Sequence, residues 1–392
     1  MFKTKEPGVF DTTNLEDLTK NLTKNQLESL VYIIQRKIKQ AYYSKIDLGS
    51  DEEFLGNFPN KCERDIEILR GRFKNGLKCP KCGNHRLNKN GRSNNRQRYI
   101  CKNCRTTFDE RSFSPLSNTK LSLDTWLKYC RFMVEGGTIR YCAQKVSVSI
   151  PTSFFMRHRI LDVLNLSVRN QVFQGIVSAD EYHLNESFKG KSIKKSIEED
   201  RYFYNFEYEN MPKGGGFTFR DSNYLLKNPE KYIKPIQVKI NTAIDRNGHV
   251  LTRIVENPHF KPYSKEKYQD MLSFFTGRLD KNAILCSFKT PLYRDAAYKL
   301  NVKFQKARNR MNEPIYTVHH VLMYHNKLSR WLSNFHGVAT KYLNNYLSWY
   351  SFLFILQKTN KIGKINDLFI EFTTKTLSIT QKQIQNRQVE LI

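Results

Sequence analysis

Four cysteines in the first third of the chain have the spacing of a metal site. Cys79 and Cys82 form one C-x2-C pair, and Cys101 and Cys104 form a second pair eighteen residues later. Two such pairs can place four thiolates around one ion, and Zn2+ accepts tetrahedral sulfur ligation at about 2.3 Å. Because four sulfur ligands leave no open coordination position, the pattern predicts a structural zinc ribbon rather than a catalytic zinc site.

Basic side chains surround these cysteines, and Arg92, Arg96 and Arg98 are the candidates for nucleic-acid contact. The chain has 65 Lys and Arg against 37 Asp and Glu, a formal net charge of +28 over 392 residues. A field of this sign attracts polyanions, and release of phosphate counterions then adds affinity. Solubility alone needs far less charge. We therefore expect a nucleic acid as the partner.

The sequence predicts neither an export signal nor a membrane span. Residues 1 to 11 lack the apolar core of a signal peptide. The longest nearly apolar run, 346 to 356, is shorter than the roughly 20 residues that a membrane helix needs. The other four cysteines are scattered along the chain and are expected to be unpaired thiols. We expect a cytoplasmic protein.

Three short helices are predicted after the ribbon, in the manner of a helix-turn-helix. The first covers about 122 to 135, the second 139 to 146, and Pro151 suits the first turn of the third. In such a motif the last helix lies in the major groove and its exposed side chains reach base edges. A generic helical packing module is the alternative. Three polar side chains of the third helix are the candidates for DNA contact: Arg157, His158 and Arg159.

From residue 175 onward the pattern changes to strands that alternate with helices, which predicts a mixed α/β domain. Strands are expected at about 175 to 183, 236 to 244, 249 to 255 and 282 to 288. Helices are expected at about 264 to 279, 319 to 334 and 340 to 357. The expected organisation is a helical accessory region (1–75), a zinc ribbon (76–110), a helix-turn-helix-like segment (111–170), an α/β domain (171–358) with an insertion at about 186–235, and a tail (359–392).

Several distinctive motifs follow one another along the chain: C-P-K-C-G at 79–83, R-Y-I-C-K-N-C at 98–104, R-H-R-I at 157–160, A-D-E at 179–181, A-I-D-R-N-G at 243–248, and Y-H-N-K-L-S-R-W-L-S-N-F-H-G-V-A-T-K-Y-L-N-N-Y-L-S-W at 324–349. In these motifs and in the order of its parts the chain resembles bacterial insertion-sequence transposases of the ISXO-like branch. The resemblance implies a DDE-type, ribonuclease-H-like mixed sheet, double-stranded transposon-end DNA as the substrate, a homo-oligomer that pairs two ends, and a location at the bacterial nucleoid.

The family's chemistry is an in-line displacement at phosphorus, assisted by two Mg2+ ions that converging carboxylates hold. By the resemblance, Asp180 matches the first acid of the family. The second acid is replaced by Phe288, and an Asn or Glu is replaced by Leu322. A phenyl ring and an isobutyl group supply no oxygen ligand, so the catalytic site is expected to be degenerate.

Two functions therefore remain open. One is a DNA-binding relative of these transposases that keeps the zinc ribbon and lacks catalysis, a pseudoenzyme. The other is an active transposase that binds Mg2+ through displaced ligands, for which Asn326, Asp245, Asp280 and Asp295 are the possible substitutes.

Overall fold

The computed structural model describes residues 70–93, 96–187, 237–256, 265–308, 315–356 and 361–389, together with short pieces at 23, 26–27, 205–206 and 233–234. The chain divides into two compact units, Met1–Gly49 and Ser50–Ile392. Nearly all described residues belong to the second unit. The predicted accessory helix lies almost entirely outside the described residues, as do Cys62 and most of the predicted insertion.

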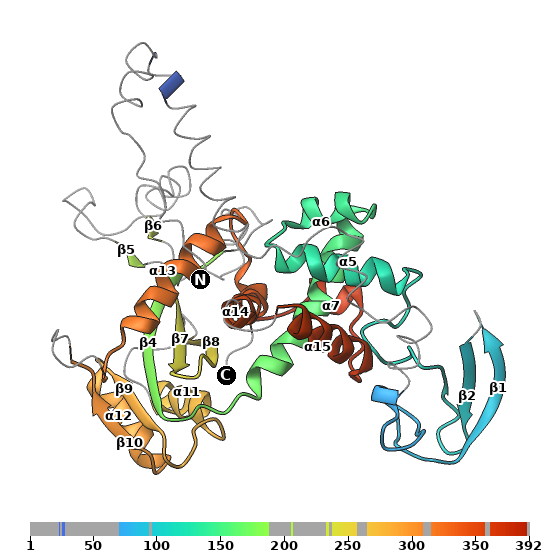
Figure 1. Cartoon of the computed structure of the whole chain (residues 1–392), viewed down its shortest axis with the longest axis horizontal. Coiled ribbons are helices and arrows are strands. Elements are labelled where there is room, and N and C mark those ends of the chain that lie inside the picture. Colours follow the sequence, from blue (N-terminus) through green and yellow to red (C-terminus); the bar gives the residue numbers. More distant parts are fainter. Residues whose placement is uncertain are drawn as a thin grey trace, which may run out of the picture. The chain divides into compact units, whose positions relative to one another are not determined.

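The ribbon is a small antiparallel sheet with the order β1-β2-β3, and Figure 1 shows β1 and β2 side by side. Its strands are β1 (Leu87–Ser93), β2 (Arg96–Cys101) and β3 (Thr107–Phe108). Cys79, Cys101 and Phe108 form its buried centre, and the Tyr99 ring lies 5.7 Å from the Phe108 ring. So small a core offers little apolar burial, and domains of this size commonly need a metal or disulfides for stability.

The three predicted helices are present: α5 (Leu123–Val134), α6 (Ile139–Lys145) and α7 (Ile150–Arg169). Each begins behind a hydroxyl side chain, from Ser122, Thr138 and Ser149 respectively, that accepts a hydrogen bond from a backbone N–H of the first turn. Such caps satisfy donors that a helix leaves unpaired at its start, so the helix starts could be predicted locally.

A five-stranded mixed sheet follows, with the order β10-β9-β4-β7-β8. β4 pairs antiparallel with β7, and β7 with β8, whereas β9 runs parallel to both β4 and β10. The turn between β7 and β8 is closed by Gly248 at φ 93°, a conformation that favours glycine. The strands are β4 (Ile176–Asn185), β7 (Gln237–Asp245), β8 (Val250–Glu256), β9 (Ile284–Ser287) and β10 (Lys303–Lys306).

Helices pack on this sheet and join it to the preceding helical segment. α11 and α14 contact β8, α12 contacts β9, and α13 contacts β4. A buried polar network links three elements, because Asn165 of α7 accepts hydrogen bonds from Arg253 of β8 (2.7 Å) and Ser348 of α14 (2.9 Å). The helices are α11 (Lys265–Phe275), α12 (Thr290–Lys299), α13 (His319–Ser333) and α14 (Thr340–Leu356).

The structure contains elements that the sequence pattern does not predict. α12 and β10 follow β9, and the residues expected as a tail form α15 (Lys361–Thr374) and α16 (Gln381–Gln385). α15 packs on α5 and α7, and α16 packs on α7. Within the insertion, two short strands pair: β5 (Asn205–Phe206) and β6 (Ile233–Lys234). Among the described helices, none is long and apolar enough to cross a membrane.

Candidate metal centre and nucleic-acid surface

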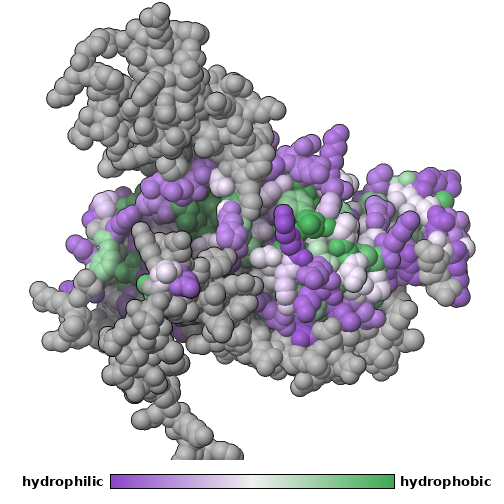
Figure 2. All heavy atoms as spheres, turned by 90° about the horizontal axis from the view of Figure 1, so that it is seen from above, coloured by the Kyte–Doolittle hydropathy of each residue, from purple (hydrophilic) through white to green (hydrophobic). Residues whose placement is uncertain are grey.

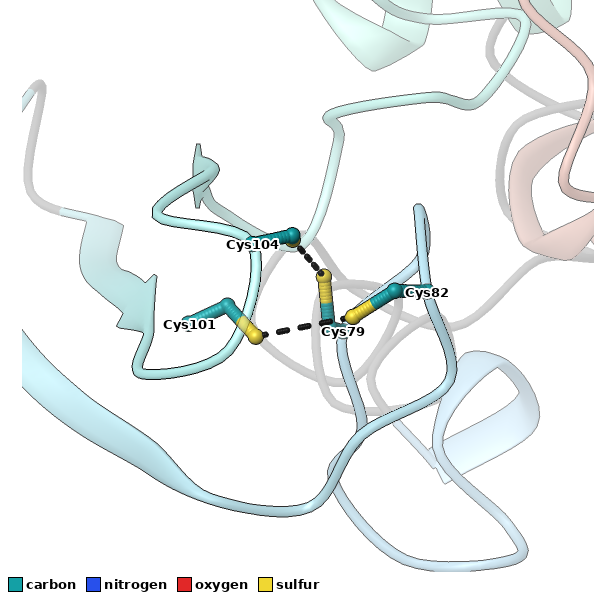
Figure 3. A group of neighbouring side chains, drawn as sticks. All are labelled: Cys79, Cys82, Cys101 and Cys104. Atoms are coloured by element: carbon teal, nitrogen blue, oxygen red, sulfur yellow. Dashed lines mark hydrogen bonds between the residues drawn. The ribbon is translucent and has the colours of Figure 1, made fainter.

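The structure brings the four predicted cysteine ligands together (Figure 3). The Sγ atoms of Cys79 and Cys104 are 3.5 Å apart, and those of Cys82 and Cys101 are 3.6 Å apart. All four sulfur atoms lie within 4.8 Å of one another. A tetrahedron with metal–sulfur bonds of about 2.3 Å has sulfur–sulfur edges of about 3.8 Å, so these two spacings are near that value and the cluster is compatible with a structural metal such as Zn2+.

The backbone explains how the four thiols converge. Gly83 N donates to Cys79 O (2.8 Å), and Arg105 N donates to Cys101 O (3.0 Å), so the two knuckles have the same turn. Gly83 and Arg105 both lie in the left-handed region, at φ 73° and 57°. The thiols differ in environment, since contact with Thr106 lowers the pKa of Cys104 to about 6, whereas burial raises the pKa of Cys79 to about 11.

The ribbon carries a dense positive charge. Residues 70 to 108 contain twelve Lys and Arg and no Asp or Glu. Arg92 and Arg98 are exposed. Arg96 differs, because it is half-buried and pairs with Asp109 (3.4 Å) and Glu110 (3.6 Å). Hydrophilic side chains cover much of the coloured face in Figure 2, with smaller apolar areas between them.

Arg157, expected to face DNA, is instead inside the protein with 0% exposure. Its Nη2 donates to Gly137 O (2.6 Å) at the turn before α6 and to Cys142 Sγ (3.3 Å). Its guanidinium lies over the Trp349 ring of α14, 4.9 Å from the centroid. A side chain enclosed in this way cannot reach a base edge, so the prediction for Arg157 is corrected.

His158 and Arg159 are also buried, at 1% and 3% exposure. The imidazole of His158 lies against the rings of Phe154 and Tyr342, at 4.4 and 4.3 Å between centroids, and burial lowers its pKa to about 3. Arg159 Nη1 donates to the carbonyl oxygens of Pro115 (2.6 Å) and Ser117 (2.7 Å). The R-H-R segment therefore holds α7 against its neighbours, and it is not a DNA-reading surface.

Asp180 lies on β4 opposite Thr242 of β7 and is 9% exposed. Its Oδ1 accepts a hydrogen bond from Glu181 N (2.9 Å), and burial raises its pKa. Thr242 Oγ1 lies 2.9 Å from His325 Nε2 on α13, and the His325 ring stacks on Tyr182 at 5.0 Å. Asp180 therefore faces the side of the sheet that α13 covers.

Phe288 directly follows β9. The pairing of β9 with β4 ends at Cys286 and Ser178, and if this parallel register continued by two residues, Phe288 would be level with Asp180. The Phe288 ring packs against the buried Cys286 and Val318, which comes directly before α13. A hydrocarbon side chain thus follows β9 at the position where the family resemblance places a second acid.

The other residues considered as metal ligands do not complete a site around Asp180. Leu322 of α13 is 42% exposed and apolar. Asp245 is held in the β7–β8 turn by His249 Nδ1 (2.7 Å), Asp280 precedes β9 at its opposite end, and Asp295 pairs with Arg294 (3.6 Å). Within the described part of the chain, the four cysteines are the one group of three or more His, Cys, Asp or Glu side chains close enough to hold a metal ion.

Glu181 forms an ion-pair cluster that the sequence pattern did not reveal. Its Oε2 lies 2.6 Å from Lys289 Nζ and 3.0 Å from Lys239 Nζ, and its side chain is 4% exposed. Burial raises the pKa of Glu181, but the hydrogen bond from Lys289 and the charge of Lys239 outweigh burial and hold the pKa below its usual range. No motif signals this cluster, because its members come from three different strands or strand ends.

No family model matches the chain. The chain is 26% identical over 121 residues to a protein from Halobacterium salinarum described as an uncharacterized protein in transposable element ISH50. The matched region covers 31% of this chain and 40% of the length of that protein.

Proposed function

We propose that this chain is a DNA-binding protein of transposon origin, built on a ribonuclease-H-like scaffold whose catalytic site is degenerate. The similarity to a protein of a transposable element supports a transposition-related role. The strand order, with three antiparallel strands followed by two parallel ones, is the order expected of the ribonuclease-H-like sheet that the family resemblance implies. The DNA-binding part is the zinc ribbon, with Cys79, Cys82, Cys101 and Cys104 as ligands and Arg92 and Arg98 contacting phosphates.

The observation that supports the degenerate site is the packing of the Phe288 ring against Cys286 and Val318 at the end of β9, the position where the family resemblance places a second acid. In enzymes that cut phosphodiesters with two Mg2+ ions, several carboxylate oxygens must hold the metals. One aspartate supplies at most two oxygens. In this proposal Asp180 is the remnant of a catalytic triad, and Phe288 and Leu322 occupy the other two slots. DNA is bound as a transposon-end duplex by a homo-oligomer, but it is not cut.

Restoring the ligands tests the proposal. The wild-type protein and the double variant Phe288→Asp with Leu322→Asn are incubated with linear duplex DNA and Mg2+ or Mn2+. We expect no metal-dependent strand cleavage by the wild type. Cleavage by the wild type that disappears in Asp180→Asn would favour the alternative of an active transposase with displaced ligands. Cleavage gained by the double variant shows that the scaffold still positions Asp180 for catalysis.

A further inference from the structure

A polar pocket of about 400 Å³ lies between the ribbon strands, the loop that leads from β3 to α5, and the segment between α15 and α16. Its size is at the lower end of the range for small-molecule sites, about 300–1,000 Å³, and suits one nucleotide. The lining side chains that matter to the argument are Arg96, Asp109, Arg111, Phe113, Asn118 and Ser378.

The walls of the pocket are held by internal contacts. Asp109 Oδ1 accepts hydrogen bonds from the backbone amides of Arg111 (3.0 Å) and Ser112 (2.9 Å), and Oδ2 pairs with Arg96. The buried Arg159 donates to the loop at Ser117 O (2.7 Å) and to Ile379 O (3.1 Å), next to Ser378. One guanidinium thus fixes both the loop and the C-terminal wall, so the pocket is formed before any ligand arrives.

The lining offers the groups that a nucleotide needs. Arg111 adds a positive charge to the lining, Arg96 is paired with Asp109, and hydroxyl and amide groups can bind the polar edge of a base. Phe113 contributes an aromatic side chain and holds φ at 59°, a conformation that bulky residues rarely adopt. The adjoining ribbon has twelve basic and no acidic residues between 70 and 108. DNA bound to the ribbon would therefore lie next to the pocket.

We infer that this pocket receives one unpaired nucleotide of the DNA that the ribbon binds. The inference rests on the proposed DNA-binding function and adds a preference for DNA with an unpaired base. An unpaired nucleotide is favoured over a paired one because it enters the pocket without the loss of a base pair and its stacking.

Fluorescence anisotropy on the full chain tests this inference with two labelled duplexes of the same sequence, one fully paired and one carrying a single unpaired thymidine. We expect the wild type to bind the duplex with the unpaired nucleotide about tenfold more tightly, the effect of one stacked base. Ser378→Trp, placed at the exposed rim, should fill the pocket and remove this preference while binding of the paired duplex stays unchanged. Thr376→Trp is the matched control, since Thr376 is exposed two residues away and does not line the pocket.

Free thymidine monophosphate is a second probe that needs no substitution. It should compete with the unpaired duplex and leave the paired duplex bound. A wild type that binds both duplexes equally overturns the pocket assignment and leaves the proposed function standing. A preference that persists in Ser378→Trp with its zinc content intact also overturns the assignment. A wild type that binds neither duplex overturns the pocket and the proposed function together.

Discussion

At the scale of single residues, the position of a charge in the fold decides its role. Arg92 and Arg157 are both arginines next to a recognisable motif, but one is exposed on a ribbon strand and the other is enclosed between helices. The guanidinium of Arg157 gains a carbonyl, a sulfur and an aromatic face in place of water. Its contribution is therefore to stability, and that can be measured.

Replacing Arg157 with Ala should destabilise the protein by about 3 kcal/mol, because it opens a cavity and leaves Gly137 O without its donor. Arg157→Met should cost less, since methionine fills much of the same space. Arg140→Ala, on the exposed face of α6, should change stability by less than about 0.5 kcal/mol. Urea unfolding measures all three. An Arg157→Ala protein of unchanged stability that has lost DNA binding would contradict the buried role.

The Glu181 cluster predicts a defined dependence of stability on pH. Because the pKa of Glu181 is lower in the folded state, its stabilising contribution is present above the unfolded pKa of about 4.3 and is lost as pH falls through the folded value. Lys289→Met should therefore destabilise the protein by about 1 kcal/mol at pH 7, a modest effect because the Lys289 side chain is 49% exposed. The difference from wild type should shrink below about pH 4.

Unfolding free energies at pH 7 and in acid, measured for wild type and Lys289→Met, check this prediction. Lys299→Met removes an exposed lysine from α12, the helix that begins directly after Lys289, and serves as the control. A difference between wild type and Lys289→Met that grows as the pH falls would show that Lys289 does not act through Glu181.

At the scale of elements, we expect the ribbon to depend on a bound metal, because its buried core contains only three side chains in the described structure. The helices α5, α6 and α7 have no such need, since they pack on one another, α14, α15 and α16 contact α7, and α15 also contacts α5. This contrast predicts that the ribbon unfolds before the helices when the metal is removed.

Purified protein should contain one zinc per chain, and acid should release it because protons compete with the metal for the thiolates. Cys82→Ser should lose the zinc and with it most of the DNA affinity, whereas Cys130→Ala, which removes a buried thiol outside the cluster, should keep both. Elemental analysis and anisotropy with duplex DNA give the two readouts. If zinc-free protein bound DNA with undiminished affinity, the zinc-bound ribbon would not be required for DNA binding.

At the scale of the whole molecule, the net charge of +28 is unevenly placed. The stretch from 70 to 108 holds twelve of the 65 basic residues and none of the 37 acidic ones. DNA binding should therefore be strongly salt-dependent, with each phosphate contact adding about one unit to the slope of log K against log salt concentration.

Arg92→Ala and Arg98→Ala should each reduce that slope by about one unit and weaken binding to all DNA sequences alike. Arg294→Ala removes an exposed arginine from α12 and should leave the slope unchanged. Binding isotherms at several salt concentrations measure this slope for each variant. If all three variants reduced the slope equally, DNA binding would depend only on the total charge of the protein and not on where the charges lie.

Features that depend on neighbouring residues could be predicted from the sequence. The four cysteines, the capping hydroxyls of α5 to α7 and the β7–β8 turn act over a few residues or one small sheet, and the structure contains each of them. α12 was missed because its buried side chains, Tyr293, Ala296 and Ala297, include two alanines and make a weak helical pattern.

Features that depend on distant residues needed the tertiary structure. Arg157 is enclosed by Trp349, 192 positions further along the chain, and no local pattern distinguishes such a helix from an exposed one. Likewise, the parallel pairing of β4 with β9 joins Ser178 to Cys286, which lie far apart in the sequence, and only the tertiary structure shows it. Local chemistry in the sequence thus specified the metal ligands, and long-range packing decided which charged side chains remain available to a partner.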